Sequence, residues 1–592
     1  MKRGLAHTLI GMALLVTTAC NAGTSAKPAI GIAKPAVTIF PSPLAAATVT
    51  AILPTLTPQP TYTQTPAPSP TPARPELLLG KMTQAQKIGQ VMFAGLGGIT
   101  TPLIEIQALL GELHLGGFIL FDSNVQSPEQ VGGLIRSFQE TVHALDDPPL
   151  LIGVDQEGGL ISRLKESAGF SEFPSPMALA ATSDPVANVR AVARAQATEL
   201  KALGINVILG PSVDVNNNPA NPIIGTRAFG SQPEQVSALA QAAIEAYQQA
   251  GILAVAKHFP GHGDTTQDSH SDLPLVPHDR ARLDSVELMP FRAAIQSGVA
   301  GIMSAHVIFP SVDDAPNLPA TLSNKVLTGL LRDDLKFDGL ALTDSLEMGA
   351  LAQAGYTIPK AAAAALAAGA DLLLFNATPD VYRATQQLIA EQITAGVIPQ
   401  QRLDEAARRV LRAKERFGLF EAPSVDTSAI ASWVGLTETR QLAQTIAAQG
   451  ITVVRDSTQQ LPLKSGAPVV VVETANAEGL GALLNAVTLR ISDQPTDDEI
   501  AAVINQTTGK TVVVATSDAA IYTRQIDLVT ALINAQVPVI VVATRSPYDA
   551  AYIKNVPTVI VTYALPPPSL RALVDVLTGR VSATGKLPIA LP

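Results

Sequence analysis

The chain has 592 residues, more than one ordinary domain needs, and 47% of them are hydrophobic whereas only 15% are charged. This composition excludes a largely disordered protein and predicts sizeable buried cores. The 40 Lys and Arg residues and 50 Asp and Glu residues give a net charge of −10 without a strongly basic region, so nucleic acid is not expected as a main partner. The single Cys excludes an intrachain disulfide and any CxxC metal site.

The first 20 residues predict an export signal. A basic start at Lys2 and Arg3 precedes a short apolar run and the small residues before Cys20. The apolar run is too short to span a bilayer comfortably. The segment resembles a bacterial lipoprotein signal, in which Cys20 is lipidated and anchors the protein to a membrane. Thr17 stands where the usual lipobox has Leu, which leaves plain secretion open as the alternative.

Residues 21–76 are expected to form an extended, disordered tether. Between Lys27 and Pro75, 12 Pro and 9 Thr occur in 49 residues, and a segment of this composition cannot bury a core. Such a tether would carry a catalytic body away from a membrane. The sequence therefore predicts an extracytoplasmic protein, held at the cell envelope by an N-terminal lipid.

Short apolar segments alternate with helical stretches over residues 77–425. Each candidate strand is apolar almost throughout, as expected of strands buried on both faces of a parallel sheet. Helical segments such as 186–203 and 233–250 lie between them. Eight alternating units predict an α/β fold closed as a (β/α)8 barrel, with a doubly wound open sheet as the alternative. The predicted strands are 91–95, 117–121, 150–154, 205–209, 252–256, 300–304, 339–343 and 371–375.

A helix over 402–417 and a connector over 421–435 lead into a second region. Residues 436–592 predict a smaller α/β sandwich domain of five or six strands with helices between them. The region has no GxGxxG sequence, so nothing supports a dinucleotide site in it. Its strands are expected near 451–455, 468–472, 511–516, 538–543 and 558–563.

Polar side chains follow most of the predicted barrel strands, at the end where barrel enzymes place their chemistry. Any one of them could be a helix cap, but their coincidence on most of the strands predicts one functional face. They are Asp155, Glu157 and Arg163 after the third strand, Asp214 and Arg227 after the fourth, Lys257 and His258 after the fifth, His306 after the sixth, Asp344 after the seventh and Asn376 after the eighth.

Four of the eight His residues fall within 21 residues of the loop after the fifth strand. His258 and His262 have the spacing of a zinc-binding helix, but a Pro and a Gly between them argue against a helix there. The alternative is a mobile, glycine-bearing loop that presents an acid/base group. Asp268 and His270 are two residues apart, so the carboxylate could hydrogen-bond the imidazole and make it a proton donor and acceptor near neutral pH.

The carboxylate at the end of the seventh strand is a candidate nucleophile. Asp344 could simply cap the next helix, but beside a His loop in the same barrel mouth it could attack a carbon or stabilise charge. One carboxylate and one acid/base group are the minimum for retaining glycoside cleavage, in which a glycosyl–enzyme forms and water then hydrolyses it. Here a His–Asp pair would replace the more usual second carboxylate.

Four motifs, in this order on a predicted barrel, carry a family resemblance. They are VDQEGG with Arg163, IIGTRAFG, KHFPGHGDTTQDSH and LTDSLEMGA. Together they resemble the bacterial β-N-acetylhexosaminidases of glycoside hydrolase family 3, and KHFPGHGDT with DSH is a highly specific signal. The resemblance covers about residues 77–425 and extends to a C-terminal domain that ends SATGKLPIALP, like that of the two-domain members.

The resemblance implies a retaining exo-glycosidase that releases terminal β-linked N-acetylglucosamine, often from peptidoglycan fragments, and needs no metal or organic cofactor. It implies that Asp344 is the nucleophile and that His270 is the acid/base, assisted by Asp268. His262 is expected only to shape the loop, and His306 to line the pocket. The residues that would hold the sugar are Asp155, Arg163, Arg227, Lys257 and His258.

Three other functions stay open at this point. The first is a β-glucosidase, against which the DSH loop argues because other branches of the family take their acid from a carboxylate elsewhere. The second is a phosphorylase, since a neutral His repels an incoming phosphate less than a carboxylate does. The third is a non-catalytic glycan-binding lipoprotein, which predicts the loss of Asp344, His270 or Asp268, and all three are present.

Overall fold

A computed structural model describes residues 73–422 and 424–592, which belong to one compact unit. The predicted signal with Cys20 and the predicted tether up to residue 72 lie outside the described residues. Among the residues that are described, no helix is long and apolar enough to cross a membrane. The first helix, α1 (Arg74–Lys81), begins just before the expected start of the barrel at residue 77.

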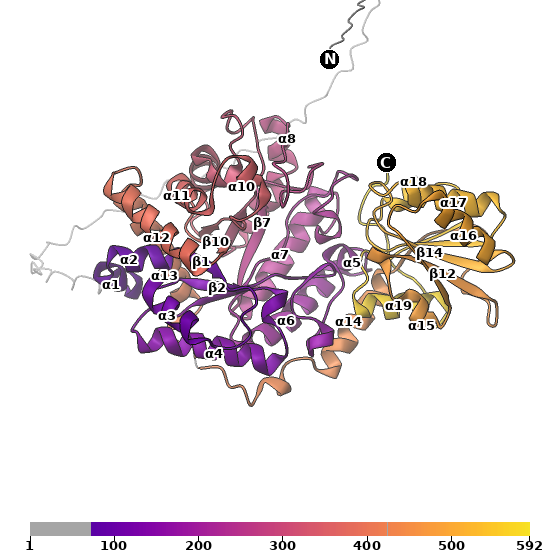
Figure 1. The fold of residues 1–592 in the computed structure, drawn as a ribbon, viewed down its shortest axis with the longest axis horizontal. Helices are drawn as coiled ribbons and strands as arrows, with labels where there is room; N and C mark the ends of the chain where they lie inside the picture. The colour runs from indigo at the N-terminus through magenta and orange to yellow at the C-terminus, as the bar shows by residue number, and fades with distance from the viewer. Residues whose placement is uncertain (1–72, 423) are drawn as a thin grey trace, which may run out of the picture. The chain divides into compact units, whose positions relative to one another are not determined.

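Eight parallel strands form the barrel, in the order β10-β1-β2-β3-β6-β7-β8-β9 (Figure 1). The ring closes between β9 and β10, where Leu342 and Leu372 form a parallel bridge and Thr343 N donates to Leu372 O. The predicted barrel is therefore confirmed in preference to an open sheet. The strands are β1 (Met92–Gly95), β2 (Gly117–Leu120), β3 (Leu151–Val154), β6 (Val207–Ile208), β7 (Leu253–Phe259), β8 (Gly301–Ser304), β9 (Leu340–Leu342) and β10 (Leu373–Asn376).

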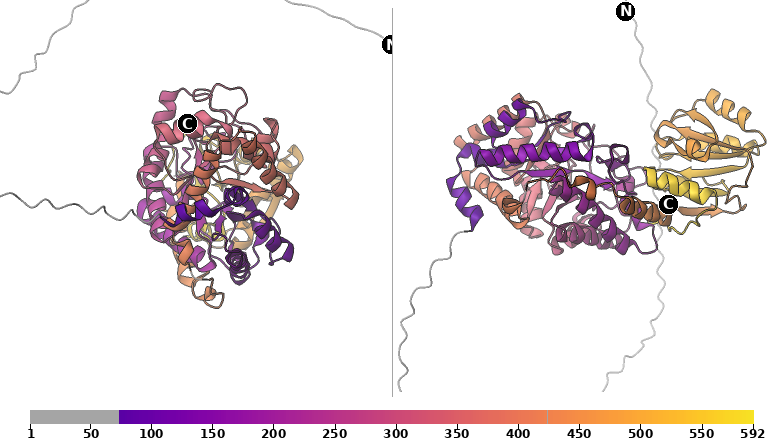
Figure 2. Two further views of the ribbon diagram at one scale, coloured as in Figure 1. Left: turned by 90° about the vertical axis from the view of Figure 1, so that its left-hand side faces the viewer. Right: turned by 90° about the horizontal axis from the view of Figure 1, so that it is seen from below.

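Helices surround the strands in the views of Figures 1 and 2, and capping residues set their ends. The helix α6 (Pro185–Leu203) begins after Asp184, whose side chain accepts from Ala187 N, and ends at Gly204 with a φ of 83°. The other barrel helices are α2 (Gln84–Gln90), α3 (Ile104–Leu113), α4 (Pro128–Ala144), α5 (Pro176–Ala180), α7 (Pro233–Gln249), α8 (Arg280–Ser285), α9 (Leu288–Gln296), a π-helix (Lys325–Asp334), α10 (Gly349–Gln353), α11 (Ile358–Ala368), α12 (Pro379–Thr394) and α13 (Gln400–Arg416).

Apolar side chains fill the barrel, and the alternation along each strand decides which residue at its end faces inward. Leu253 and Val255 of β7 belong to the interior cluster, so Lys257 is the next residue on the inward face. Every second residue also faces inward along β9 and β3. This alternation leads from Leu342 of β9 to Asp344 and from Leu151 of β3 to Asp155. The charged groups of the barrel mouth are thus the top layer of the barrel interior.

The second domain is a six-stranded sheet in the order β11-β16-β15-β14-β12-β13, parallel except for β11. Helices α16 and α17 cover one face and α15 and α19 the other (Figure 1). The strands are β11 (Thr452–Asp456), β12 (Val469–Thr474), β13 (Val487–Ile491), β14 (Thr511–Thr516), β15 (Val539–Ala543) and β16 (Thr558–Val561). The helices are α14 (Thr437–Gly450), α15 (Leu480–Leu484), α16 (Asp497–Thr507), α17 (Arg524–Asn534), α18 (Asp549–Tyr552) and α19 (Pro567–Leu577).

Two strand features were not predicted. The edge strand β13 is half-exposed and carries alternating polar residues, so it lacks the apolar run that marked the other strands. A two-stranded antiparallel hairpin of β4 (Gln156–Gly158) and β5 (Ile161–Ser162) follows β3. Its turn uses Gly158 and Gly159, whose φ angles of 95° and 61° favour glycine.

The two domains share a buried apolar cluster. Met177 and Ala178 of α5 pack in it with Tyr548, Tyr563 and Ile589 of the second domain. Helix α5 follows the hairpin of β4 and β5 in the chain. The shared cluster therefore holds a segment that comes directly after a loop of the barrel mouth.

A buried carboxylate links three parts of the barrel wall, and its loss should be costly. Asp371 is fully buried and accepts from Arg332 and Arg402, each at 2.5 Å. We expect Asp371→Ala to lower the free energy of unfolding by about 3–5 kcal/mol, because two largely buried guanidinium groups lose the fully buried carboxylate that they share. Urea unfolding followed by circular dichroism measures the change.

Asp338→Ala is the matched control, since its carboxylate is 81% exposed and lies 3.4 Å from Arg409. An exposed pair of this kind contributes little. An equal loss of stability in the two variants would contradict the role given to Asp371.

Candidate active site

A buried network of opposite charges forms the floor of the barrel mouth. Lys257 is 2% exposed, and its Nζ donates to Asp155 Oδ1 at 2.6 Å and lies 2.8 Å from Glu157 Oε1. Arg227 donates its Nε and Nη2 to the two oxygens of Glu157, both at 2.9 Å. Two cations thus face two carboxylates, and buried ions are tolerated only in such paired arrangements. The structure brings together three of the predicted sugar-binding residues, Asp155, Lys257 and Arg227.

The network keeps its members charged. Burial alone would raise the pKa of Glu157, but Arg227 and Lys257 outweigh it and hold that pKa far below its usual range. Burial would lower the pKa of Arg227, but Glu157 raises it above the ordinary value. The pKa of Lys257 is raised in the same way, because Asp155 and Glu157 outweigh the effect of burial. At neutral pH the floor therefore offers fixed charges to a ligand.

Asp214, for which the sequence predicted only a place on the functional face, holds His258 in position. His258 Nδ1 lies 2.7 Å from Asp214 Oδ2, and its Nε2 lies 3.2 Å from Arg227 Nη2. Asp214 also accepts from the backbone N of His258 at 3.2 Å and of His262 at 2.6 Å. Burial would raise the pKa of Asp214, but His258 and His262 outweigh it and lower that pKa. The carboxylate therefore ties the end of β7 to the loop beyond it.

His262 shapes the loop after β7, as expected. It is buried, with Nδ1 2.9 Å from Thr265 Oγ1 and Nε2 2.9 Å from Ser269 Oγ. Burial, helped by His258, lowers the pKa of His262 to about 4, so the ring is neutral at neutral pH. The strand β7 extends to Phe259, so His258 and His262 do not share a helix and the zinc-helix alternative is wrong.

The predicted pair of Asp268 and His270 forms. His270 Nδ1 lies 2.7 Å from Asp268 Oδ1, which also accepts from the His270 backbone N at 2.9 Å. The side chains are 58% exposed for His270 and 36% exposed for Asp268. With Nδ1 held by the carboxylate, Nε2 is the ring nitrogen that can exchange a proton with a substrate.

Backbone hydrogen bonds dock this loop against the motif that contains Asp344. Gly349 N donates to His270 O at 2.9 Å, and Ala350 N donates to Ser269 O at 3.3 Å. A Cβ at Gly349 would lie 2.7 Å from His270 O, so the close approach requires glycine. No hydrogen bond or ion pair joins the side chains of His270 and Asp344 in the part of the chain that the structure describes. A substrate would lie between two such groups in glycoside cleavage.

Asp344 is held in its ionised form. The backbone N of Ser345 donates to Asp344 Oδ1 at 2.8 Å. Burial would raise the pKa of Asp344, but His258, His306, the Ser345 N–H and Lys257 together lower it. His306 lies fully buried, with its Nε2 3.0 Å from Ser345 O, and supports the segment that carries the nucleophile candidate.

Asp122, which stands directly after β2, was not among the predicted site residues. Arg163 Nη1 donates to Asp122 Oδ1 at 3.2 Å, and Arg163 Nη2 lies 4.0 Å from Asp155 Oδ2. Lys165 Nζ also donates to Asp122, at 2.9 Å. The position of Asp122 after a strand was the available signal. These contacts bring Arg163, the fourth predicted sugar-binding residue, to the edge of the charged floor.

One group of described residues has donor atoms close enough together to hold a metal ion, namely Asp264, His278 and Glu287. His278 Nε2 lies 2.7 Å from Asp264 Oδ2. Arg282 Nη2 lies 3.1 Å from Glu287 Oε1 and 3.6 Å from Asp264 Oδ2. The guanidinium already supplies the positive charge that a metal would bring, so this cluster is best explained as an ion-pair network under the loop.

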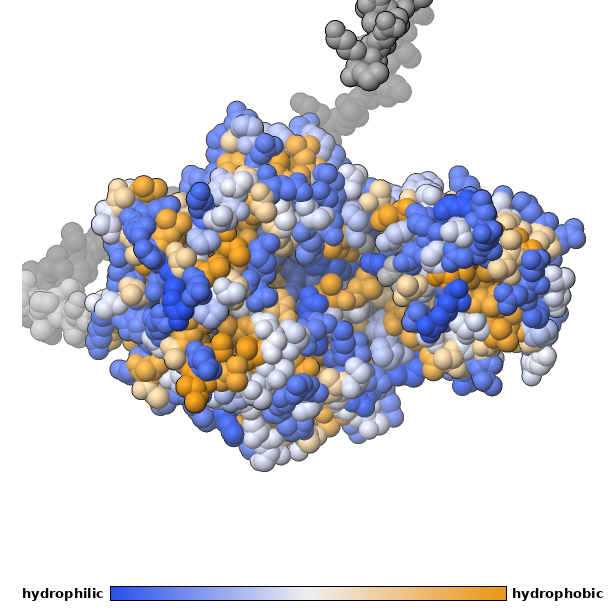
Figure 3. Space-filling model, viewed as in Figure 1, coloured by the Kyte–Doolittle hydropathy of each residue, from blue (hydrophilic) through white to orange (hydrophobic). Residues whose placement is uncertain are grey.

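Some buried polar atoms without a hydrogen-bonding partner among the described residues lie on the loops that follow β3 and β6. Each such atom costs free energy unless water or a ligand meets it. A ligand with many hydroxyl groups would satisfy them, and Figure 3 shows a recess with hydrophilic residues in its floor near the middle of the face in view. They include Ser162 Oγ, Arg163 Nε, Asn216 Oδ1, Asn217 Oδ1 and Thr226 Oγ1.

Comparison with known proteins identifies the class to which this fold and site belong. Residues 83–413, more than half of the chain, match the N-terminal domain of glycosyl hydrolase family 3. The chain belongs to this family, and it is therefore a glycoside-cleaving enzyme by class.

Individual members of the family show which kind of enzyme the chain is similar to. Beta-hexosaminidase A of Pseudoalteromonas piscicida is 34% identical over 391 residues, which are 63% of this chain and 64% of the relative, so the match spans less than two thirds of that protein. A beta-hexosaminidase of Alkalilimnicola ehrlichii is 41% identical over 281 residues, 47% of this chain and 78% of the relative. The solved β-N-acetylglucosaminidase from Paenibacillus sp. str. FPU-7 is 38% identical with a TM-score of 0.80, over 86% of this chain and 99% of that chain.

Replacement of Asp214 by Asn tests its role, since the variant keeps the shape and removes the charge. We expect the free energy of unfolding at pH 7 to fall by about 1.5–3 kcal/mol, the usual contribution of hydrogen bonds to a charged group. Because the pKa of Asp214 is lowered in the folded state, its contribution is present above the ordinary pKa of about 3.9 and is lost as the pH falls through the folded value. Urea unfolding at pH 7 and at pH 3.5 measures the difference, which should shrink at the lower pH.

Asp272→Asn is the control, because Asp272 lies on the loop after β7 that Asp214 holds, and its carboxylate accepts from the exposed Ser271 hydroxyl. It should leave stability nearly unchanged. A loss in Asp214→Asn that does not depend on pH would count against a charge effect.

Proposed function

We propose that the chain is a retaining exo-β-N-acetylglucosaminidase. The observation that carries the proposal is the exposed Asp268–His270 pair, on a loop whose backbone is docked against the motif of Asp344. The names of the relatives and of the solved neighbour support the choice of sugar. Together they favour a hexosaminidase over a glucosidase.

In the first step, the Asp344 carboxylate attacks the anomeric carbon of the sugar. His270 enters this step protonated and gives the Nε2 proton to the glycosidic oxygen, so the aglycone leaves as an alcohol. A glycosyl–Asp344 ester forms as the glycosidic bond breaks. Asp268 stays ionised, orients the ring through Nδ1 and stabilises the imidazolium.

In the second step, His270 acts as the base. Its neutral Nε2 takes a proton from water while the water oxygen attacks the anomeric carbon, and the ester bond to Asp344 breaks. The sugar leaves with its original β configuration, the carboxylate is restored, and His270 is protonated again. The lowered pKa of Asp344 suits both steps, since it must be ionised to attack and must leave as an anion.

The charged floor would hold the terminal sugar. Asp155 accepts from sugar hydroxyls, while Arg163, Arg227 and Lys257 donate to hydroxyl and carbonyl oxygens. His258 would line the site, with Nδ1 on Asp214 and Nε2 beside the Arg227 guanidinium. Apolar side chains fill the barrel below this layer, so the floor closes the site from beneath. A terminal sugar bound on this floor would give the proposed exo mode of attack.

Two substitutions separate the proposed roles. Asp344→Asn should lower kcat for aryl N-acetyl-β-glucosaminides by about a thousandfold or more, because the nucleophile is lost. His270→Ala should slow substrates with poor leaving groups by about 10²- to 10⁴-fold but spare the glycosylation step of a dinitrophenyl glycoside, which needs no proton. Steady-state and burst kinetics on a leaving-group series measure both effects.

Asp272→Asn again serves as the control on the same loop and should retain activity. Full activity in Asp344→Asn would refute the mechanism. Aryl glucosides and a phosphate buffer complete the panel: faster turnover of the glucoside would indicate a β-glucosidase, and release of a sugar 1-phosphate would indicate a phosphorylase. Binding of N-acetylglucosamine without any turnover by the intact protein would indicate a non-catalytic glycan-binding protein.

We also propose that the enzyme works at the cell envelope on peptidoglycan fragments, anchored through Cys20. The basis is the signal-like sequence before Cys20 and the Pro- and Thr-rich segment after it. In a bacterial host, labelled palmitate should enter the full-length protein but not Cys20→Ala, and only the former should sediment with membranes. Equal release of both proteins into the medium would reject the anchor in favour of plain secretion.

A further inference from the structure

The C-terminal domain contacts the two barrel loops that carry the candidate sugar-binding arginines. We name residues 155–175, which follow β3, the β3 loop, and residues 212–231, which follow β6, the β6 loop. Arg163 belongs to the β3 loop, and Arg227 to the β6 loop. The contacts of the two loops decide what the C-terminal domain can do for the active site.

The first contact is at the start of the β6 loop. Tyr548, 2% exposed, donates its hydroxyl to Asn216 O at 2.8 Å. Asn216 N in turn donates to Gly230 O at 3.0 Å, which closes the loop at its neck. Burial raises the pKa of Tyr548 to about 12, so the hydroxyl remains a donor over the whole working range of pH.

The second contact is at the other side of this neck. Ser231 N donates to Pro588 O at 3.4 Å, and Ser231 Oγ accepts from Ala590 N at 3.2 Å. A Cβ at Gly230 would lie 2.4 Å from Pro588 O, so the chain end can approach only because residue 230 is glycine. The last residues of the chain thus pack on the end of the β6 loop.

Between these two contacts, the β6 loop reaches the proposed sugar site twice. Arg227 pairs with Glu157 and lies against His258. Asn221 donates its amide to His262 O at 2.9 Å and to Gly263 O at 3.0 Å. A shift of the loop neck would therefore move both a sugar-binding group and the start of the loop that carries His270.

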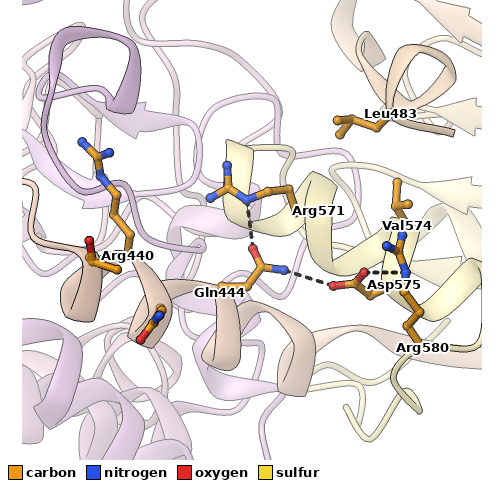
Figure 4. A pocket seen from close by; sticks show the side chains of 9 residues that line it. Arg440, Gln444, Leu483, Arg571, Val574, Asp575 and Arg580 are labelled. Carbon is orange, nitrogen blue, oxygen red and sulfur yellow. Dashed lines mark hydrogen bonds and ion pairs between the residues drawn. The ribbon is translucent and has the colours of Figure 1, made fainter. Parts of the chain in front are cut away.

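The third contact is on the β3 loop. Arg571 donates both Nη atoms to Glu166, at 2.9 and 3.1 Å, and its Nε donates to Gln444 at 3.1 Å. Glu166 stands shortly after Arg163 in the chain. Arg571 and Gln444 line a groove of about 670 Å³, shown in Figure 4. Arg580 lines the same groove but pairs with Asp575 of its own domain, at 3.0 Å.

We propose that the C-terminal domain is a positioning element for the sugar pocket, with Tyr548 and Arg571 as its positioning residues. Neither residue touches the reacting atoms; each fixes a loop whose arginine faces the sugar. Loops open easily unless other parts of the structure hold them, and small displacements of a binding group greatly lower the rate. The identity of the sugar rests on the proposed function. The inference that the C-terminal domain fixes the β3 and β6 loops does not.

Tyr548→Phe tests the first contact, because it removes one hydroxyl and keeps the packed ring. We expect KM for an aryl N-acetyl-β-glucosaminide to rise by about 5- to 20-fold, and amide hydrogen exchange to quicken in peptides from residues 216–231. Tyr552→Phe is the matched control, since Tyr552 ends the short helix α18, which Tyr548 directly precedes, but is 40% exposed. It should change neither quantity.

Arg571→Met and Arg580→Met form the second matched pair, one facing a barrel loop and one facing its own domain. The first should raise KM and the exchange rate of residues 163–172, and Arg571→Lys should restore part of the loss. The second should do neither. Unchanged KM and exchange in both Tyr548→Phe and Arg571→Met would overturn the proposal.

Uniformly faster exchange throughout the chain, with kcat lowered and KM unchanged, would show a merely structural role and would also overturn it. If the wild-type enzyme does not cleave the N-acetylglucosaminide at all, the proposed function fails. The exchange measurements still decide whether the C-terminal domain holds the loops.

Discussion

The pairing of Lys257 and Arg227 with Glu157 is the constraint on which the rest of the site depends. A cation cannot stay in the top layer of a packed barrel without a counter-charge, and Glu157 faces both cations at 2.8–2.9 Å. Because Lys257 comes from β7, Glu157 from the loop after β3 and Arg227 from the loop after β6, one carboxylate sets the relative positions of three segments. Asp155 then completes the balance and remains the partly exposed member that can meet a ligand.

Four Asp–His pairs of the described residues share a nitrogen–oxygen distance of 2.7 Å. Burial separates the roles of two of them, Asp214 with His258 and Asp268 with His270. In the pair of Asp214 and His258 the carboxylate also accepts two backbone N–H groups, so the pair is a fixed part of the wall. In the pair of Asp268 and His270 both side chains are open to solvent, so a proton can enter and leave. Burial thus decides whether an Asp–His pair is a fixed part of the wall or can exchange a proton with solvent.

Much of the fold was predictable because buried parallel strands are apolar runs. All eight barrel strands fell in such runs, and the alternation along β7 explains why Lys257 lies inside the barrel mouth although Lys is usually exposed. The edge strand β13 escaped prediction because one of its faces is polar. The hairpin of β4 and β5 escaped because it is too short to show a period.

The candidate residues could be named from their places after strands, but their partners could not. The positions of Asp122, Glu157 and Asp214 were visible in the sequence, yet nothing local distinguishes a carboxylate that holds a neighbour from one that meets a ligand. That difference depends on contacts between loops distant in sequence, such as Glu157 with Arg227 or Asp214 with His258. The same holds for Tyr548, whose partner Asn216 lies in another domain.

The candidate acid/base pair lies on a loop of the barrel, and this position changes what the second domain has to do. If the acid came from the C-terminal domain, that domain would have to sit directly over the sugar. Here Asp268 and His270 come from the barrel itself, and their loop is docked by the backbone of Gly349 and Ala350. The C-terminal domain is then free to act from the side, through the ends of the loops that carry Arg163 and Arg227. Its contacts with the two loops, at the neck of the β6 loop and at the Glu166 carboxylate of the β3 loop, fit this arrangement. The proposal assigns a function to a domain that contributes no candidate catalytic side chain.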